Sequence, residues 1–292
     1  MAAVPVRGAR PSRGMAFTDL TRALPLTAFF ALAYLLSWSY WLVTLGIMGR
    51  GTLAWFVPGA FGPPVAALVV TGVVEGRAGI GAFLRRWIRW RVAPRWYLVA
   101  LMGLPTVGLL VGLRLGDGTG RFAGTGPSVA VTYLATLSFL VVLGGGQEEP
   151  GWRGFALPRM QASMGPVTAS VLLGLLWGLW HLPVFVLVPG YNSAGPGVTS
   201  IVTSLLVFTA FGAVGQSLIL TWLFNNTRGS VLLAMLAHAS LNAGSAFVSG
   251  HVGTMAVFAC LAVLGLTLAV VTRGTLSYRP SARVVRHQSA IR

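Results

Sequence analysis

The sequence is poor in charge and almost free of cysteine. It contains one cysteine and five acidic residues in 292, and all 21 basic residues are arginine. The single Cys260 excludes an internal disulfide and a cysteine metal cluster. Charged residues make up only 9% of the chain and hydrophobic residues 55%, whereas soluble domains carry about a quarter charged residues. The composition therefore excludes an ordinary soluble domain and indicates an integral membrane protein.

Long apolar stretches account for most of the chain and define its organisation. The first is too long for the apolar region of a cleavable signal peptide, so we expect it to remain as an anchor. We predict an all-α, polytopic membrane helix bundle of about eight transmembrane helices, forming one domain over 24–272 between basic tails at 1–23 and 273–292. The eight stretches are 24–48, 54–74, 96–115, 128–147, 165–188, 199–224, 229–248 and 253–272.

The arginines are distributed unevenly between the two sides of this arrangement. Only Arg50, Arg114 and Arg121 fall on the side opposite the termini, so 21 − 3 = 18 lie on the same side as the termini. Positive charge flanking membrane spans marks the cytoplasmic side. We therefore predict cytoplasmic termini in a multi-pass protein of a bacterial plasma membrane, with lipids rather than nucleic acid as partners of the arginines.

The basic stretch 81–97 alternates arginine with tryptophan and apolar residues. This pattern is typical of an amphipathic helix lying on the membrane surface. We interpret it as an interfacial anchor that leads into the third span.

A few strongly polar side chains lie within the apolar stretches, where each costs about 2.5–3.5 kcal/mol on insertion scales. Two are adjacent glutamates at the end of the fourth stretch, which the orientation places on the cytoplasmic side. The candidates are Glu148, Glu149, His181, Gln216, His238 and Asn242.

Helical spacing groups these side chains. Trp177 with His181, His238 with Asn242, and Glu149 with Arg153 each stand four residues apart and so share a helix face. We expect Trp177 to shield the His181 imidazole and Arg153 to pair with Glu149, which leaves Glu148 to face other groups. The two histidines are predicted at similar depth, and Gln216 is interpreted as structural.

Two chemistries suit this set of residues. A buried carboxylate next to a second carboxylate takes a proton from water as a general base, while imidazoles and a carboxamide orient that water or stabilise an oxyanion. Two histidines and a glutamate, Glu148 with His181 and His238, would equally hold Zn²⁺ with an open position for water. Both chemistries indicate hydrolysis of a carbonyl compound, either with zinc or without a cofactor. The alternative to both is that these polar groups only join helices.

The sequence resembles the CPBP family, which includes the CaaX prenyl protease type 2 and Abi proteins. The pattern E-E-x-x-x-R matches Glu148, Glu149 and Arg153, and H-x-x-x-N matches His238 and Asn242. The pattern F-x-x-x-H matches at His181, with Trp177 in the aromatic position. The resemblance covers about residues 80–248.

This resemblance implies an intramembrane endopeptidase that cleaves near the C-terminus of a peptide or protein, in a cavity facing the cytosol. It implies that Glu148 activates water, His181 and His238 assist or bind metal, Asn242 stabilises the oxyanion, and Glu149 and Arg153 support the site. The motifs of zinc membrane proteases and rhomboids, H-E-x-x-H and G-x-S-G, do not occur in the sequence. The competing hypothesis is a non-catalytic binding, immunity or scaffold protein of the same family.

Overall fold

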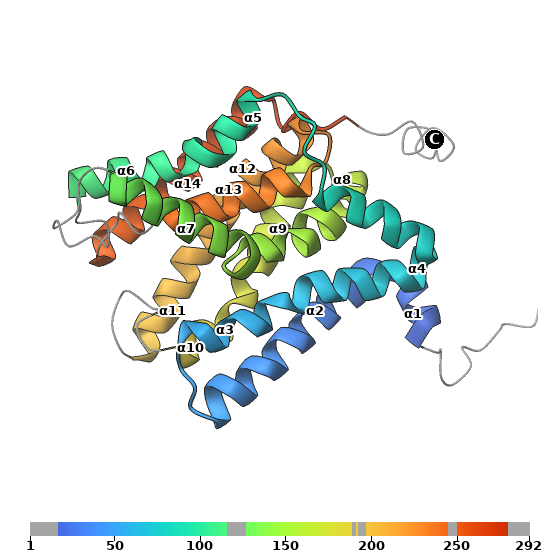
Figure 1. Cartoon of the computed structure of the whole chain (residues 1–292). Coiled ribbons are helices and arrows are strands. Elements are labelled where there is room, and N and C mark those ends of the chain that lie inside the picture. The colour runs from blue at the N-terminus through green and yellow to red at the C-terminus, as the bar shows by residue number, and fades with distance from the viewer. Residues whose placement is uncertain (1–16, 116–126, 189–190, 192–196, 245–249, 280–292) are drawn as a thin grey trace, which may run out of the picture.

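The computed structural model describes residues 17–115, 127–188, 191, 197–244 and 250–279, and these residues form helices joined by short connections (Figure 1). Several spans combine an α-helix with a short 3₁₀ or π-helical segment. The α-helices are α1 (Phe17–Ala23), α2 (Pro25–Trp41), α3 (Leu53–Phe56), α4 (Gly62–Trp87), α5 (Arg95–Leu98), α6 (Leu104–Leu115), α7 (Pro127–Leu143), α8 (Leu157–Met164), α9 (Pro166–Trp180), α10 (Leu182–Leu187), α11 (Val198–Val207), α12 (Val214–Asn226), α13 (Val231–Gly244) and α14 (Gly250–Val271). The other helical segments are η1 (Leu42–Ile47), η2 (Val57–Phe61), η3 (Val99–Gly103), η4 (Gly146–Glu148), η5 (Pro150–Ala156) and η6 (Phe208–Ala213).

The predicted polytopic helical fold is confirmed. Seven helical stretches are long and apolar enough to cross a membrane, and α13 is a shorter apolar helix at the position of the seventh predicted span. Residues 245–248 of that predicted span lie outside the described residues. The seven long stretches are Pro25–Ile47, Ala54–Trp87, Arg95–Gly112, Ala130–Glu148, Pro166–Leu187, Val198–Asn226 and Val252–Val271.

Close helix crossings in the centre of the bundle depend on small residues. A Cβ atom on Gly174 of α9 would lie 2.7 Å from the Cα atom of Val214, and one on Gly178 would lie 2.6 Å from Thr209. Two small residues four apart let helix backbones approach within van der Waals contact, which is how helices associate where no water is present to drive them together. This crossing fixes α9 against η6 and α12, and α9 carries Trp177 and ends at His181.

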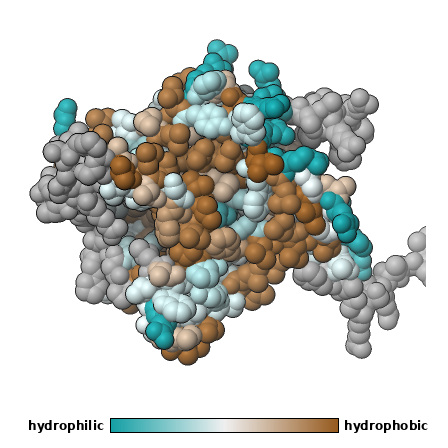
Figure 2. Space-filling model, viewed as in Figure 1, coloured by the Kyte–Doolittle hydropathy of each residue, from teal (hydrophilic) through white to brown (hydrophobic). Residues whose placement is uncertain are grey.

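The outer surface is apolar along the helices. Figure 2 shows hydrophobic residues over most of the face in view and hydrophilic residues gathered towards its edges. Large aliphatic side chains such as Leu35, Leu110, Leu134 and Val270 are more than half exposed. Such a surface suits contact with lipid rather than with water.

The basic connections between helices meet at one end of the bundle. Arg89 donates a hydrogen bond to the carbonyl of Arg228, Arg228 donates one to the carbonyl of Arg91, and the Ser230 hydroxyl donates one to the carbonyl of Arg89 at 2.6 Å. These bonds join the α4–α5 connection to the α12–α13 connection. We refer to this end, defined by residues 88–94 and 227–230, as the arginine end.

Three segments differ from the simplest sequence-based expectations. The stretch 81–97 is not one surface helix, because α4 continues to Trp87 after a kink at Gly76 (φ 64°) and α5 begins only at Arg95. The segment predicted as an N-terminal tail contains α1, in which Thr21 is buried. Beyond α14, the carbonyl of Leu276 accepts a hydrogen bond from Asn225 at 3.0 Å.

Candidate active site

The two glutamates lie inside the bundle. Every residue from 145 to 157 is buried, and η5 and α8 continue the chain in helical form to Met164. The fourth spanning stretch does end at Glu148, as the sequence predicted, but the chain beyond it stays buried within the protein instead of reaching its surface. Within it, Arg153 donates a hydrogen bond to Glu149, a contact that a hydropathy profile cannot reveal.

Gly145 brings the backbone close to the third motif. Its φ of 112° lies in a region that favours glycine. A Cβ atom at this position would lie 2.6 Å from the amide nitrogen of Asn242 and 2.7 Å from Nε2 of His238. Asn242 donates a hydrogen bond of 2.9 Å from Nδ2 to the carbonyl of Gly144. The glycine run thus lets η4 lie directly against α13.

Glu149 joins two of the motifs through one oxygen atom. Its Oε1 accepts a hydrogen bond of 3.1 Å from the Arg153 guanidinium and one of 2.7 Å from Nδ1 of His238. The side chains of Glu149 and Arg153 are both fully buried. The predicted Glu149–Arg153 ion pair is confirmed, and His238 is an additional partner that helical spacing alone did not suggest. Because Nδ1 of His238 donates to Glu149, its Nε2 is left on the side facing Gly145.

Trp177 contacts the remaining members of the site. Its indole nitrogen donates a hydrogen bond of 2.7 Å to Oε2 of Glu148. Its ring packs edge-to-face on both imidazoles, at centroid distances of 5.6 Å from His181 and 5.2 Å from His238. The guanidinium of Arg153 lies 5.3 Å from the same ring system. The aromatic residue of the second motif therefore shields both histidines, not only the one on its own helix.

His181 occupies the junction between α9 and α10. Its Nδ1 lies 2.9 Å from the carbonyl of Trp177, and since a carbonyl accepts, Nδ1 carries the hydrogen and Nε2 the lone pair. The helix α9 begins at Pro166, so His181 lies about 22 Å along it at 1.5 Å per residue, whereas His238 lies about 10 Å along α13. Both imidazoles nevertheless pack against the same ring, that of Trp177, and line the same cavity.

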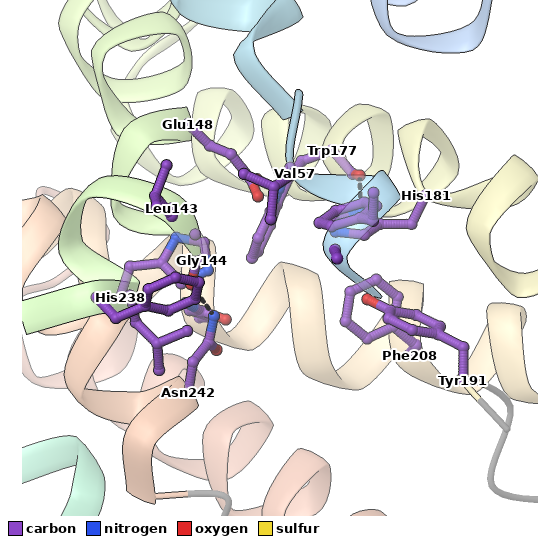
Figure 3. A pocket seen from close by; sticks show the side chains of 16 residues that line it. Val57, Leu143, Gly144, Glu148, Trp177, His181, Tyr191, Phe208, His238 and Asn242 are labelled. Atoms are coloured by element: carbon purple, nitrogen blue, oxygen red, sulfur yellow. Dashed lines mark hydrogen bonds between the residues drawn. The ribbon is translucent and has the colours of Figure 1, made fainter. Parts of the chain in front are cut away.

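A cavity of about 500 Å³ connects these residues (Figure 3). Glu148, Trp177, His181, His238 and Asn242 all line it, whereas Glu149 and Arg153 do not. Sequence reasoning missed most of the apolar wall, because its residues carry no motif. The other lining residues are Ala54, Phe56, Val57, Phe139, Leu140, Leu143, Gly144, Gly145, Tyr191, Phe208 and Gln216.

The proposed zinc ligands do not fit together in this structure. The ring of Trp177 lies between His181 and His238, and Oε2 of Glu148 is held by the indole nitrogen. Among the described residues, no group of three or more His, Cys, Asp or Glu side chains is placed to hold a metal ion. A tetrahedral zinc site needs such ligands around one point at about 2 Å, so these residues as placed do not fit a zinc ion.

Comparison with known proteins identifies the part of the chain that contains this site. Residues 130–244 match the sequence model of a family described as Rce1-like, type II CAAX prenyl endopeptidase. A relative named CAAX prenyl protease 2, from Methanococcus maripaludis, is 30% identical over 134 residues, which are 46% of this chain and 48% of the relative. The chain thus spans about half the length of the curated relative it matches. The family resemblance inferred from the motifs is confirmed.

The different environments of the two glutamates predict different effects on stability. Replacing Glu149 with Gln leaves the buried Arg153 without its counter-charge, which costs about 3–5 kcal/mol. Replacing Glu148 with Gln removes no ion pair and retains an acceptor for Trp177. We therefore expect Glu149→Gln to lower the melting temperature of detergent-solubilised protein strongly and Glu148→Gln to change it little. Equal melting temperatures for the two variants would contradict this assignment.

Proposed function

We propose that this chain is an intramembrane endopeptidase that hydrolyses a peptide bond with water activated by Glu148. Its residues 130–244 match the Rce1-like family of type II CAAX prenyl endopeptidases. The observation that carries the proposal is the contrast between the adjacent glutamates. Glu149 is tied to Arg153 and His238, whereas Glu148 lines the cavity and has no ion pair among the described residues.

The proposed reaction begins with a water molecule hydrogen-bonded to the Glu148 carboxylate. The carboxylate takes one proton from the water while the oxygen of the water bonds to the carbonyl carbon of the scissile peptide bond. The former carbonyl oxygen becomes the oxyanion of a tetrahedral intermediate. When the carbon–nitrogen bond breaks, Glu148 gives this proton to the departing amine. Glu148 returns to its starting state, and the products are a carboxylic acid and an amine.

The other residues act by orientation in this proposal. Nε2 of His181 has its lone pair free of the Trp177 hydrogen bond and would accept a hydrogen bond from the water or the substrate. Nδ2 of Asn242 lies at Gly145, where it would stabilise the oxyanion, whereas Nε2 of His238 carries the lone pair and would accept a hydrogen bond there. Glu149 and Arg153 would hold His238 in place through the Glu149 carboxylate.

The substrate class follows from the cavity and from the family. The wall of the cavity is mostly aliphatic and aromatic, so it suits an apolar peptide segment. The relative's name refers to proteins ending in a C-a-a-X sequence, whose cysteine is prenylated. We propose cleavage near the C-terminus of a peptide or protein, with the prenyl group as a feature to be tested.

The central test is the activity of Glu148→Gln. Purified protein in liposomes would be given peptides ending in C-a-a-X, with and without a farnesyl group, and a mixture of unmodified peptides. We expect the wild type to cleave one of these sets and Glu148→Gln to be slower by about 10²–10⁴-fold, the usual contribution of a general base. The matched control is Glu75→Gln, because Glu75 pairs with Arg159 outside the cavity.

Two outcomes would overturn the proposal. Full activity of Glu148→Gln would show that another group activates the water. Tight peptide binding without cleavage by the wild type would favour the alternative of a binding, immunity or scaffold protein.

We further propose that the termini are cytoplasmic, because the arginine end lies on the same side as the termini in the predicted order of spans. The lining of the cavity comes from both halves of the bundle: Ala54 and Val57 begin the second span, whereas Gly145 and Glu148 lie at the end of the fourth. The orientation is therefore proposed from the arginines alone.

Thiol labelling of whole cells tests this orientation. In a Cys260→Ala background, Trp55→Cys lies next to the cavity and Arg91→Cys at the arginine end, and both positions are exposed. A membrane-impermeant maleimide should label the Trp55→Cys variant on intact cells and the Arg91→Cys variant only after lysis. The reverse pattern would show that the arginine end is external and would contradict cytoplasmic termini.

A further inference from the structure

Gln216 is a polar residue of the cavity that has no role in the reaction described above. It lies in α12, its side chain is only 4% exposed, and it lines the same cavity as Glu148, His181 and His238. It comes from a helix that contributes none of the motif residues. Because it lines the cavity, it is in a position to contact a substrate, whereas the sequence suggested only a structural role.

The amide nitrogen of Gln216 has no hydrogen-bond partner within the described part of the protein. Several buried polar atoms in the described part of the chain lack a partner, and Nε2 of Gln216 is the one that belongs to a cavity-lining side chain. A buried donor without an acceptor is unfavourable and asks for an explanation. Gln161 shows the usual solution, since it is equally buried but exchanges two hydrogen bonds with Asn225, at 2.8 and 3.2 Å.

The chemistry of the wall restricts what this donor can bind. The lining residues include no arginine, so the cavity offers no cation for a carboxylate or phosphate. A carboxamide is neutral and has the same polar groups as a peptide bond, so it pairs with a peptide carbonyl without burying a charge.

We propose that Gln216 is a positioning residue: its Nε2 donates a hydrogen bond to a backbone carbonyl of the substrate next to the scissile bond. This inference rests on the proposed endopeptidase function. An extended peptide fixed at this carbonyl would present the following bond to the water at Glu148. The donor is satisfied only when a peptide occupies the cavity, so its contribution is made to binding rather than to folding.

The test compares Gln216→Met with Gln161→Met, which removes a glutamine of similar burial that is already paired. For Gln216→Met we expect KM to rise about tenfold, equivalent to one hydrogen bond, with little change in kcat and no loss of melting temperature. For Gln161→Met we expect a lower melting temperature and an unchanged KM. Gln216→Met with unchanged KM and lower melting temperature would overturn the inference.

A substrate series identifies the acceptor. Peptides in which one carbonyl at a time is reduced to a methylene should bind the wild type about tenfold more weakly at one position. The reduced peptide that binds the wild type more weakly should bind the Gln216→Met variant as well as the unreduced peptide does, because the two changes remove one shared interaction. Independent losses would contradict the pairing. If the wild type cleaves no peptide, the proposed function fails; if it cleaves but this coupling is absent, only the role of Gln216 fails.

Discussion

The buried carboxylate of Glu149 is the interaction on which the site depends. One of its oxygens accepts hydrogen bonds from Arg153, on the helical segment after the glutamates, and from His238, on α13. A buried carboxylate is stable only when it is paired and hydrogen-bonded in this way. This single group therefore fixes η5 against α13 and sets the orientation of the His238 ring. Removal of Arg153 would leave the Glu149 carboxylate as an uncompensated charge in the interior, and removal of His238 would take away one of its two hydrogen bonds.

The fixed position of Glu149 gives its neighbour a different role. Glu148 points from the same backbone segment into the cavity, where Trp177 holds one of its oxygens. Trp177 also contacts both imidazoles, so the spacing of Glu148 from the histidines is set by an aromatic ring rather than by a metal. The small residues of α9 make this possible, because Gly174 lets the helix approach α12 closely and Gly178 lets it approach η6.

The motifs and the helical fold could be predicted from the sequence, but much of the site could not. Periodicity and hydropathy located the spans, and spacing along one helix predicted the Glu149–Arg153 pair. The Glu149–His238 bond joins residues 89 positions apart, so no local pattern contains it. The burial of 145–157 was missed because paired charges lower hydropathy without bringing a segment to the surface. The lining residues Val57 and Phe208 have no sequence signal, since an apolar residue in a cavity resembles one facing lipid.

The central claim is that Glu148 activates water instead of attacking the substrate itself. The most direct measurement is turnover in water enriched in ¹⁸O, followed by mass spectrometry of the product and of the enzyme peptide containing Glu148. The account predicts ¹⁸O in the new carboxylate of the product and none in Glu148, because the water oxygen bonds directly to the scissile carbon. Incorporation of ¹⁸O into Glu148 during turnover, and not in enzyme incubated without substrate, would reveal a covalent intermediate on that carboxylate and contradict the account.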